Sequence, residues 1–318
     1  MTTTAPEVAL AAPDIARWRE SASGLDYVHS FAAAEPGPHV LVTALVHGNE
    51  ICGAIALDRL LSSGLRPERG RLSLAFVNVA AYGRFDPAEP AASRFVDEDF
   101  NRLWTPARLD SRERSVELAR ARALRPLVEA ADLLLDIHSL QQGADPLLLA
   151  GPLEKGRQLA RRVGTPATIV ADRGHAAGTR MRDFGAFGDP ASEKTALLVE
   201  CGPHWQAGTD QVALATLWHF LTRVGCLAAE GPAPWPLPPG PLPPQRVVEV
   251  SEAVTVETSA FRFSRPYRGL EVVPAAGTVI ARDGKREVRT PYDDCVLVMP
   301  SLRLQPGQTA VRLGRLVA

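Results

Sequence analysis

The sequence is poor in cysteine, has no surplus of basic charge and contains no long apolar run. Its 318 residues include four cysteines, Cys52, Cys201, Cys226 and Cys295, and no two of them form a CxxC pair. This pattern excludes a dense disulfide framework, and it favours a reduced, cytoplasmic protein over one with a structural zinc knuckle. No segment reaches the roughly 20 apolar residues that span a bilayer, and the first residues lack the pattern of a signal peptide. We therefore expect neither a signal peptide nor a membrane partner.

The charges nearly cancel, with 35 basic and 36 acidic residues and a net charge of −1. Proteins that bind nucleic acid through its phosphates need a basic surplus, so we do not expect a nucleic-acid partner. The arginines between Arg108 and Arg125 alternate with Glu113 and Glu117, which indicates a solvated helix face rather than a basic patch. Hydrophobic residues make up 46% of the chain, enough for the core of a soluble globular protein.

Apolar segments with strand character alternate with helical segments over the first two-thirds of the chain. Several of the strand-like segments are apolar on both faces, as expected for a sheet that helices cover on both sides. This alternation predicts an α/β sandwich with a mostly parallel or mixed central sheet flanked by helices. We expect strands at 39–46, 71–79, 132–137, 146–150, 167–171 and 195–200, and helices at 50–63, 111–131 and 209–224. The second helix should have Ser111 as its N-cap and a kink or break at Pro126.

A proline-rich segment divides the chain. Eight prolines fall between Pro232 and Pro244, which is typical of an extended linker and incompatible with a helix or a central strand. Beyond it, short alternating segments separated by turn residues indicate strands. We predict an α/β domain at 1–228, a linker at 229–246 and a small C-terminal all-β domain at 247–318.

Two histidines and a glutamate stand where predicted strands end. His47 follows the strand at 39–46, His138 follows "LLLDI", and Glu200 ends "TALLVE". In open α/β sheets, ligands bind beyond the carboxyl ends of the strands, so these three side chains should meet in one crevice. Glu50 follows His47 by three residues, and side chains at that spacing face the same side of a helical turn.

The residue types at these positions suit a metal. His47, Glu50 and His138 offer two imidazoles and a carboxylate, a set that fits Zn²⁺ and leaves a fourth position for water, as in catalytic zinc sites. Taken alone, the pair of His47 and Glu50 fits equally well a histidine that caps a strand beside a surface glutamate, because the pattern is short.

A polar loop, "SRFVDEDFNRLW" at 93–104, holds a second group of candidates. Asn101 and Arg102 are neighbouring planar donors suited to a carboxylate, and Arg94 adds another guanidinium. On its own, such a loop is more often a surface cluster of salt bridges.

Together, these motifs resemble the succinylglutamate desuccinylase/aspartoacylase family, a branch of the zinc carboxypeptidase superfamily. The resemblance rests on "HGNEICG" at 47–53, "RFVDEDFNRLW" at 94–104, "DIH" at 136–138 and "VECGPH" at 199–204, which occur in that order. It implies a zinc-carboxypeptidase-like sandwich whose catalytic domain is residues 1–228. It also implies one zinc ion per chain, with the ligands His47, Glu50 and His138.

The resemblance implies a role for each remaining candidate. Glu200 matches the catalytic carboxylate that takes a proton from water, and Arg94 matches the arginine that polarises the scissile carbonyl. Asn101 and Arg102 match the pair that grips a free carboxylate of the substrate. Two aspartates, Asp99 and Asp136, would orient the histidine ligands. The implied reaction is the zinc-dependent hydrolysis of an amide, with an N-acyl amino acid or a related small N-acyl amine as substrate.

The sequence also departs from this family. After His138 it reads "SLQQG" in place of the Asn-Thr-Thr run of aspartoacylases, so the acyl side of the pocket should differ. The glycine-rich loop "DRGHAAGTRMRDFGAFGDP" is typical of an active-site lid. From it we take Arg180 as a substrate-binding candidate, with His175 and Arg182 beside it, and from the β domain we take Tyr292. For each of these four, a solvent-exposed loop residue is an equal alternative.

Other functions stay open at this point. A metallocarboxypeptidase acting on peptides would use the same centre; an open groove would favour it, whereas a β domain that restricts access would favour a small substrate carrying a carboxylate. A non-catalytic metal-binding protein on the same scaffold is a further alternative, although no candidate residue is missing. A serine hydrolase is not expected, because the sequence has no GxSxG motif. The acyl group, the amine and the formation of a homo-oligomer are left open by the sequence.

Overall fold

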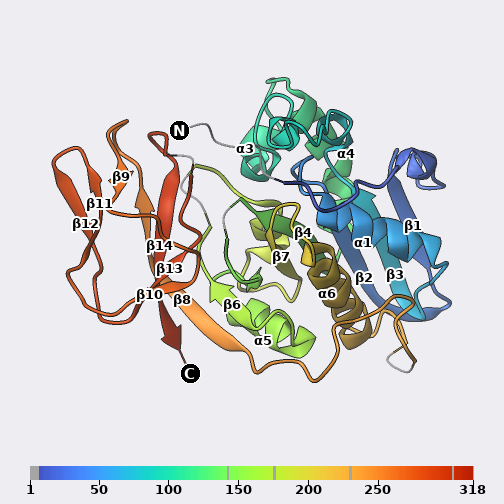
Figure 1. The fold of residues 1–318 in the computed structure, drawn as a ribbon. Helices are drawn as coiled ribbons and strands as arrows, with labels where there is room; N and C mark the ends of the chain where they lie inside the picture. Colours follow the sequence, from blue (N-terminus) through green and yellow to red (C-terminus); the bar gives the residue numbers. More distant parts are fainter. Residues whose placement is uncertain (1–6, 142, 175–176, 229–230, 303, 318) are drawn as a thin grey trace.

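The protein is a layered α/β structure in which one sheet runs through most of the molecule (Figure 1). The computed structural model describes residues 7–141, 143–174, 177–228, 231–302 and 304–317. The helices are α1 (Ile51–Ser62), α2 (Val79–Tyr82), α3 (Pro106–Leu109), α4 (Val116–Ala130), α5 (Glu154–Val163) and α6 (Thr209–Arg223). Short 3-10 turns are η1 (Ala16–Trp18), η2 (Ala92–Arg94), η3 (Phe100–Arg102), η4 (Met181–Asp183) and η5 (Gly185–Phe187).

The strands fall into two groups along the chain. The first group is β1 (Val28–Ala32), β2 (Glu35–Ala44), β3 (Arg69–Phe76), β4 (Leu133–Leu140), β5 (Leu147–Leu149), β6 (Thr168–Ala171) and β7 (Thr195–Pro203). The second is β8 (Arg246–Thr255), β9 (Arg262–Phe263), β10 (Glu271–Val273), β11 (Val279–Asp283), β12 (Arg286–Arg289), β13 (Cys295–Val298) and β14 (Thr309–Val317). Eleven of them form one sheet in the order β1-β3-β2-β4-β7-β5-β6-β8-β14-β13-β10, and β12-β11-β9 form a separate small sheet. The predicted fold class is confirmed.

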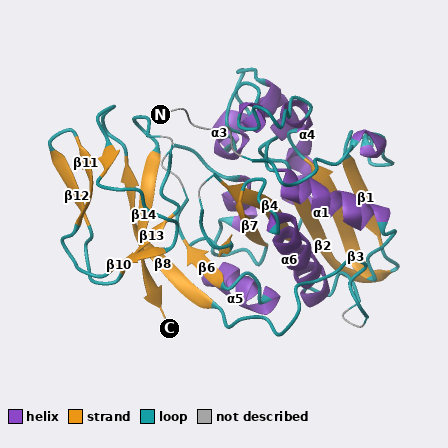
Figure 2. Ribbon diagram, viewed as in Figure 1, coloured by secondary structure: helices purple, strands orange, loops and turns teal. Residues whose placement is uncertain are grey.

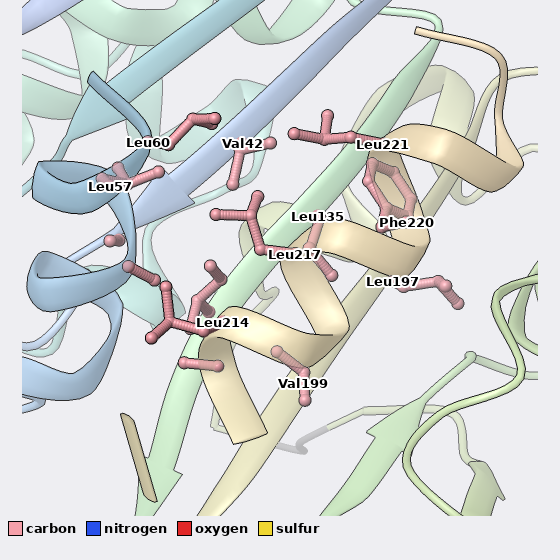
Figure 3. Close-up of a cluster of buried hydrophobic side chains, with 14 of the residues drawn as sticks. Val42, Leu57, Leu60, Leu135, Leu197, Val199, Leu214, Leu217, Phe220 and Leu221 are labelled. Atoms are coloured by element: carbon pink, nitrogen blue, oxygen red, sulfur yellow. The ribbon is translucent and has the colours of Figure 1, made fainter. Parts of the chain in front are cut away.

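Helices cover both faces of the first half of the sheet. On one face, α1, α5 and α6 pack on apolar side chains of β2, β4 and β7. Figure 3 shows Leu214, Leu217 and Phe220 of α6 over Val42 and Leu135 of the neighbouring strands. On the other face, α4 and the segment after α2 bury a second cluster. This double cover explains why these strands are apolar on both sides.

Several local details differ from the sequence-based expectations. The N-cap of α4 is Ser115, whose hydroxyl accepts a hydrogen bond from the Leu118 amide, and not Ser111. Pro126 lies inside α4 without ending it, because the helix buries an apolar face on both sides of the proline and this packing outweighs one missing hydrogen bond. The expected solvated face was wrong for Glu117, which is wholly buried. The sheet is mixed, since β5 runs antiparallel to β7 and β1 antiparallel to β3.

The C-terminal region (residues 246–318) continues the same sheet. β8 pairs in parallel with β6, and β14 pairs antiparallel with β8. Figure 2 shows strands and loops, but no helix, in the described part of this region. The proline-rich segment before it packs on the core: Trp235 is buried and lies edge-on to Trp218, with 6.2 Å between the rings. The domain limits stay a prediction.

All four cysteines are buried free thiols, in keeping with the dispersed pattern in the sequence. Among the helices of the described residues, none has the length and apolar character that crossing a membrane requires.

Candidate active site

The candidate residues gather at the carboxyl end of three neighbouring parallel strands, β2, β4 and β7. His47 lies in the turn after β2, and Glu50 is the N-cap residue of α1. His138 and Glu200 are Cα partners on β4 and β7, so the sheet itself holds them side by side. Gly48 is required by a close approach: a Cβ atom there would collide with the backbone of Ala81 and Tyr82 and with the Ser93 carbonyl.

His47, Glu50 and His138 form a compact buried group. The Nδ1 atom of His47 lies 2.8 Å from Glu50 Oε1, and the Nδ1 atom of His138 lies 2.8 Å from Glu50 Oε2. One candidate ligand atom from each residue lies within 4.8 Å of the others. Among the residues that the structure describes, the sequence-predicted metal ligands therefore do meet.

Each histidine has an aspartate behind it. Asp136 Oδ2 lies 2.9 Å from His138 Nε2, and Thr43 donates a 2.7 Å hydrogen bond to the other oxygen of Asp136. Asp99 Oδ1 lies 3.0 Å from His47 Nε2. A carboxylate at Nε2 keeps the proton on that nitrogen and leaves Nδ1 as the free lone pair, which is the arrangement of metal-binding histidines.

The electrostatics of this group favour a cation. Burial opposes ionisation of Glu50, yet the facing imidazoles of His47 and His138 lower its pKa well below the ordinary value. Burial also disfavours a charged His138, yet Asp136 and Glu50 raise the pKa of this histidine well above the ordinary value. Two inward-facing nitrogens and a carboxylate that together stabilise positive charge fit Zn²⁺.

Glu200 faces the same cavity from β7. Burial raises the pKa of Glu200 to about 8, with a further upward contribution from Glu50, against the opposing charges of His138 and Arg94. Its Oε2 atom has no hydrogen-bond partner among the described residues. A buried carboxyl group with a pKa near neutrality is suited to accept and return a proton.

Arg94 reaches the metal-ligand group from the polar loop. Its Nη1 atom lies 3.2 Å from Glu50 Oε1, and its Nη2 atom lies 2.8 Å from His47 Nε2 and 3.3 Å from Asp99 Oδ2. A protonated Nε2 of His47 donates to Asp99 and cannot also accept from Arg94. A metal held at Nδ1 with the proton on Nε2 would therefore weaken the contact between Arg94 and His47.

Asn101 and Arg102 lie in the same loop. Asn101 Oδ1 accepts a 2.8 Å hydrogen bond from the Met181 amide, which ties this loop to the segment carrying Arg180. Arg102 lines the cavity and is held by the carbonyl of Asn101 at 2.8 Å. Burial lowers the pKa of Arg102 to about 10, and Arg94 and Arg180 act in the same direction, so it remains a cation at neutral pH.

Of the two remaining substrate-binding candidates, one lines the cavity and the other does not. Arg180 lines the cavity and is wholly buried, with its guanidinium 2.8 Å from Asp172 and 2.6 Å from Asp183. Tyr292 is absent from the described lining; its hydroxyl lies 2.7 Å from Ser251 Oγ, and Arg315 stacks on its ring.

Arg182 turns away from the cavity lining, donating to the backbone carbonyls of Ala150 and Ala196 at 3.1 and 2.8 Å. His175 lies outside the described residues.

The cavity measures about 250 Å³ and is closed in part by the C-terminal region. Met299, Leu302 and Arg312 from this region line it together with the loop and sheet residues described above. Arg312 is buried, with Nε 3.1 Å from Asp172 Oδ2. Sequence reasoning missed these residues, because nothing local to them signals a site some 100 residues away along the chain.

Ser139 and His204 also line the cavity. Ser139, the first residue of "SLQQG", lies with its hydroxyl 2.6 Å from Nδ1 of His204, the last residue of "VECGPH". The Ser139 amide also donates to Glu50 Oε2 at 3.2 Å. Burial lowers the pKa of His204 to about 4, so this imidazole is neutral at physiological pH.

Comparison with known proteins bears on the family. Residues 36–217 match the model described as the succinylglutamate desuccinylase/aspartoacylase catalytic domain. A succinylglutamate desuccinylase from Burkholderia lata is 29% identical over 325 residues, covering 95% of this chain and 86% of that protein. A human N-acyl-aromatic-L-amino acid amidohydrolase (carboxylate-forming) is 32% identical over 129 residues, 36% of this chain and 38% of the human protein.

Solved structures share the fold. A succinylglutamate desuccinylase from Vibrio parahaemolyticus matches with a TM-score of 0.68 at 18% identity, over 92% of this chain and 87% of the other. Murine aminoacylase 3 matches with a TM-score of 0.59 at 20% identity, over 90% of this chain and 97% of the other.

Proposed function

The chain belongs to the succinylglutamate desuccinylase/aspartoacylase family, and we propose that it is a zinc-dependent amidohydrolase that deacylates an N-acyl amino acid or a related small N-acyl amine. The observation that carries this proposal is the geometry of four buried residues. Two imidazole Nδ1 atoms face one carboxylate, and Glu200 is the strand partner of His138 beside them. The named activities of the two curated relatives, a desuccinylase and an N-acyl amino acid amidohydrolase, are of the same chemical class.

His47, Glu50 and His138 would hold one Zn²⁺ per chain. When bound, the ion supplies a Lewis acid that lowers the pKa of water and polarises a carbonyl group. Asp99 and Asp136 keep both imidazoles in the tautomer that presents Nδ1.

The other residues would handle the proton and the developing charge. Glu200 takes a proton from the attacking water and later gives it to the nitrogen of the leaving amine, so the carboxylate is regenerated in each cycle. Arg94 would donate hydrogen bonds to the carbonyl oxygen as that oxygen becomes negative. The lining of one cavity by both Arg94 and Glu200 supports these roles.

The cavity supports a small substrate that carries a carboxylate. Arg102 and Arg180 line it with guanidinium groups, and a guanidinium binds a carboxylate through paired hydrogen bonds. Because Arg180 is already paired with Asp172 and Asp183, Arg102 is the better placed of the two for the substrate. A volume of about 250 Å³ under the C-terminal region suits an N-acyl amino acid and leaves little room for an extended peptide. This observation counts against a peptide substrate for the same centre.

The test combines metal analysis with a hydrolysis screen. Purified protein should contain about one zinc per chain, should release amine from some N-acyl amino acids, and should lose this activity with a chelator. Glu200→Gln should keep its zinc and lose hydrolysis by about 1,000-fold or more, since the proton acceptor is gone. Protein without zinc that is indifferent to chelation, or a Glu200→Gln variant that turns over normally, would refute the proposal.

A further inference from the structure

Glu117, on the first turn of α4, has no place in the proposed chemistry, yet it is 0% exposed. One carboxylate oxygen accepts hydrogen bonds from the Val96 amide at 2.6 Å and from Asn78 Nδ2 at 3.0 Å. The other accepts from the amides of Asp97 and Glu98 at 3.0 and 3.3 Å. Four donors surround one carboxylate, and three of them are consecutive backbone amides. A glutamate on an ordinary helix surface would face water instead.

The contact is reciprocal. Asp97 accepts a 2.7 Å hydrogen bond from the Val116 amide, and Glu98 accepts one from the Ser115 hydroxyl, so the loop in turn caps α4. The helix and the loop therefore hold each other on both sides of Glu117. Glu117 is therefore one anchor of the loop, because without its carboxylate three partly buried backbone amides would lose their acceptor, and an unpaired amide away from water is costly.

The fixed amides lie between the residues that reach the cavity. Arg94 lies two residues before Val96, and Asp99, Asn101 and Arg102 follow Glu98 within four residues. We call residues 94–102 the arginine segment. At its other points the segment is tied to the site by the Gly48 amide, which donates to the Arg94 carbonyl at 3.0 Å, and by the Met181 amide on Asn101.

We propose that Glu117 is a positioning residue, which sets the place of the arginine segment and through it the placement of Arg94 and Arg102 on the substrate. The inference rests on the proposed function. It assigns a role in that reaction to Glu117, a residue that would touch neither metal nor substrate. Rates respond steeply to such placement, since a displacement of about 1 Å of a reacting group costs about 100-fold. Glu117 thus affects the reaction only through the loop whose amides it binds.

The substitution Glu117→Gln tests this with little change in size. A carboxamide has one oxygen for the four donors, and its NH₂ group would face amide hydrogens that need an acceptor. With zinc supplied in excess, we expect kcat to fall by about 10- to 100-fold and amides 96–98 to exchange hydrogen at least about 10-fold faster. Glu117→Asp, which keeps the charge, should recover part of kcat.

Arg120→Gln serves as the matched control. Arg120 lies one turn further along α4, and its guanidinium is hydrogen-bonded to the backbone carbonyls of Asp26, Phe76 and Val77. Replacing Arg120 should lower the stability of the protein through the same helix. Arg120 has no described contact with the arginine segment, so the segment itself should stay in place. Arg120→Gln should therefore leave kcat and the exchange of amides 96–98 near their wild-type values.

A double-mutant cycle with Arg94→Ala separates positioning from general damage. If Glu117 works through Arg94, Glu117→Gln should cost less than about 3-fold in kcat once Arg94 is absent. An equal loss in both backgrounds, unchanged exchange at 96–98, or the same loss in Arg120→Gln would overturn the inference. If the wild-type protein hydrolyses no N-acyl amino acid, the proposed function fails, and the exchange comparison alone decides whether Glu117 anchors the segment.

Discussion

Replacing Asp172 by asparagine removes the charge of a buried carboxylate that two arginines share. Asp172 Oδ1 lies 2.8 Å from Arg180, and Oδ2 lies 3.2 Å from Arg180 and 3.1 Å from Arg312. Burial alone would raise the pKa of Asp172, but the charges of Arg180 and Arg312 lower it to about 2. In the unfolded chain the same group should titrate near its usual value of about 3.9. The difference measures how strongly the fold prefers the ionised form.

The magnitude follows from linkage. A shift of about 1.9 pKa units is worth about 2.6 kcal/mol of stability at pH 7. Because the folded pKa lies below the unfolded one, this contribution is complete above about pH 5, about half is lost by pH 3, and it vanishes as the pH falls through about 2. An unfolding entropy of about 2.1 cal/mol/K per residue gives about 0.7 kcal/mol/K over 318 residues. The substitution should therefore lower Tm by about 4 °C at pH 7.

Urea denaturation of the wild type and Asp172→Asn, each at pH 7, 5, 4 and 3, measures the predicted gap. We expect a gap of about 2.6 kcal/mol at pH 7 and pH 5 that closes to about half at pH 3. A gap that stays constant across this range, or one below about 1 kcal/mol at pH 7, would show that the two arginines do not depend on the Asp172 charge. Asp210→Asn, at the start of α6, is the control and should change stability little at any of these pH values.

Three further predictions concern the site. Asp136→Asn should weaken zinc binding by about 10- to 100-fold in a chelator competition, because the acceptor at Nε2 of His138 loses its negative charge; an unchanged affinity would contradict this. Arg102→Ala should raise KM for substrates with a free carboxylate far more than for uncharged amides, and equal losses on both would remove its clamp role. Gly48→Ala should lower the free energy of unfolding by about 1–3 kcal/mol or more and lower the zinc content. Gly83→Ala is the control and should be nearly neutral, because Gly83 has a φ of −60° and an added Cβ would lie 3.4 Å from its nearest neighbour. Equal effects of the two substitutions would refute the close-approach argument.

The grouping of the candidate metal ligands could be predicted because their positions follow from local patterns. His47, three residues after β2, and His138, two residues before the end of β4, both lie at the carboxyl edge of the sheet, and the spacing of His47 and Glu50 places both on one turn. Those rules do not depend on distant parts of the chain. The break expected at Pro126 was wrong for the opposite reason, because the packing of α4 on the sheet decides its fate and local propensity does not.

The rest of the site depends on contacts across long stretches of sequence. Arg312 reaches the cavity because β14 pairs with β8 and β8 with β6, a placement that no local pattern of β14 reveals. Glu117 looks like any acidic residue at a helix N-terminus until the loop amides are seen around it. Tyr292 was predicted from its chemistry alone, and in the loop between β12 and β13 its hydroxyl contacts Ser251 instead.

The hydrogen bonds between β6 and β8 have a consequence for protein engineering. A truncated chain that stops in the proline-rich segment would leave β6 as a bare sheet edge, uncover the apolar side chains of Leu149 and Val170, and delete Arg312. Unprotected edges of this kind pair with other chains, so such a fragment should aggregate. For the same reason, a graft of the C-terminal part of a relative has to preserve the pairing of β6 with β8 and the contact of Arg312 with Asp172. The cover and the metal-binding half have to be redesigned as one body.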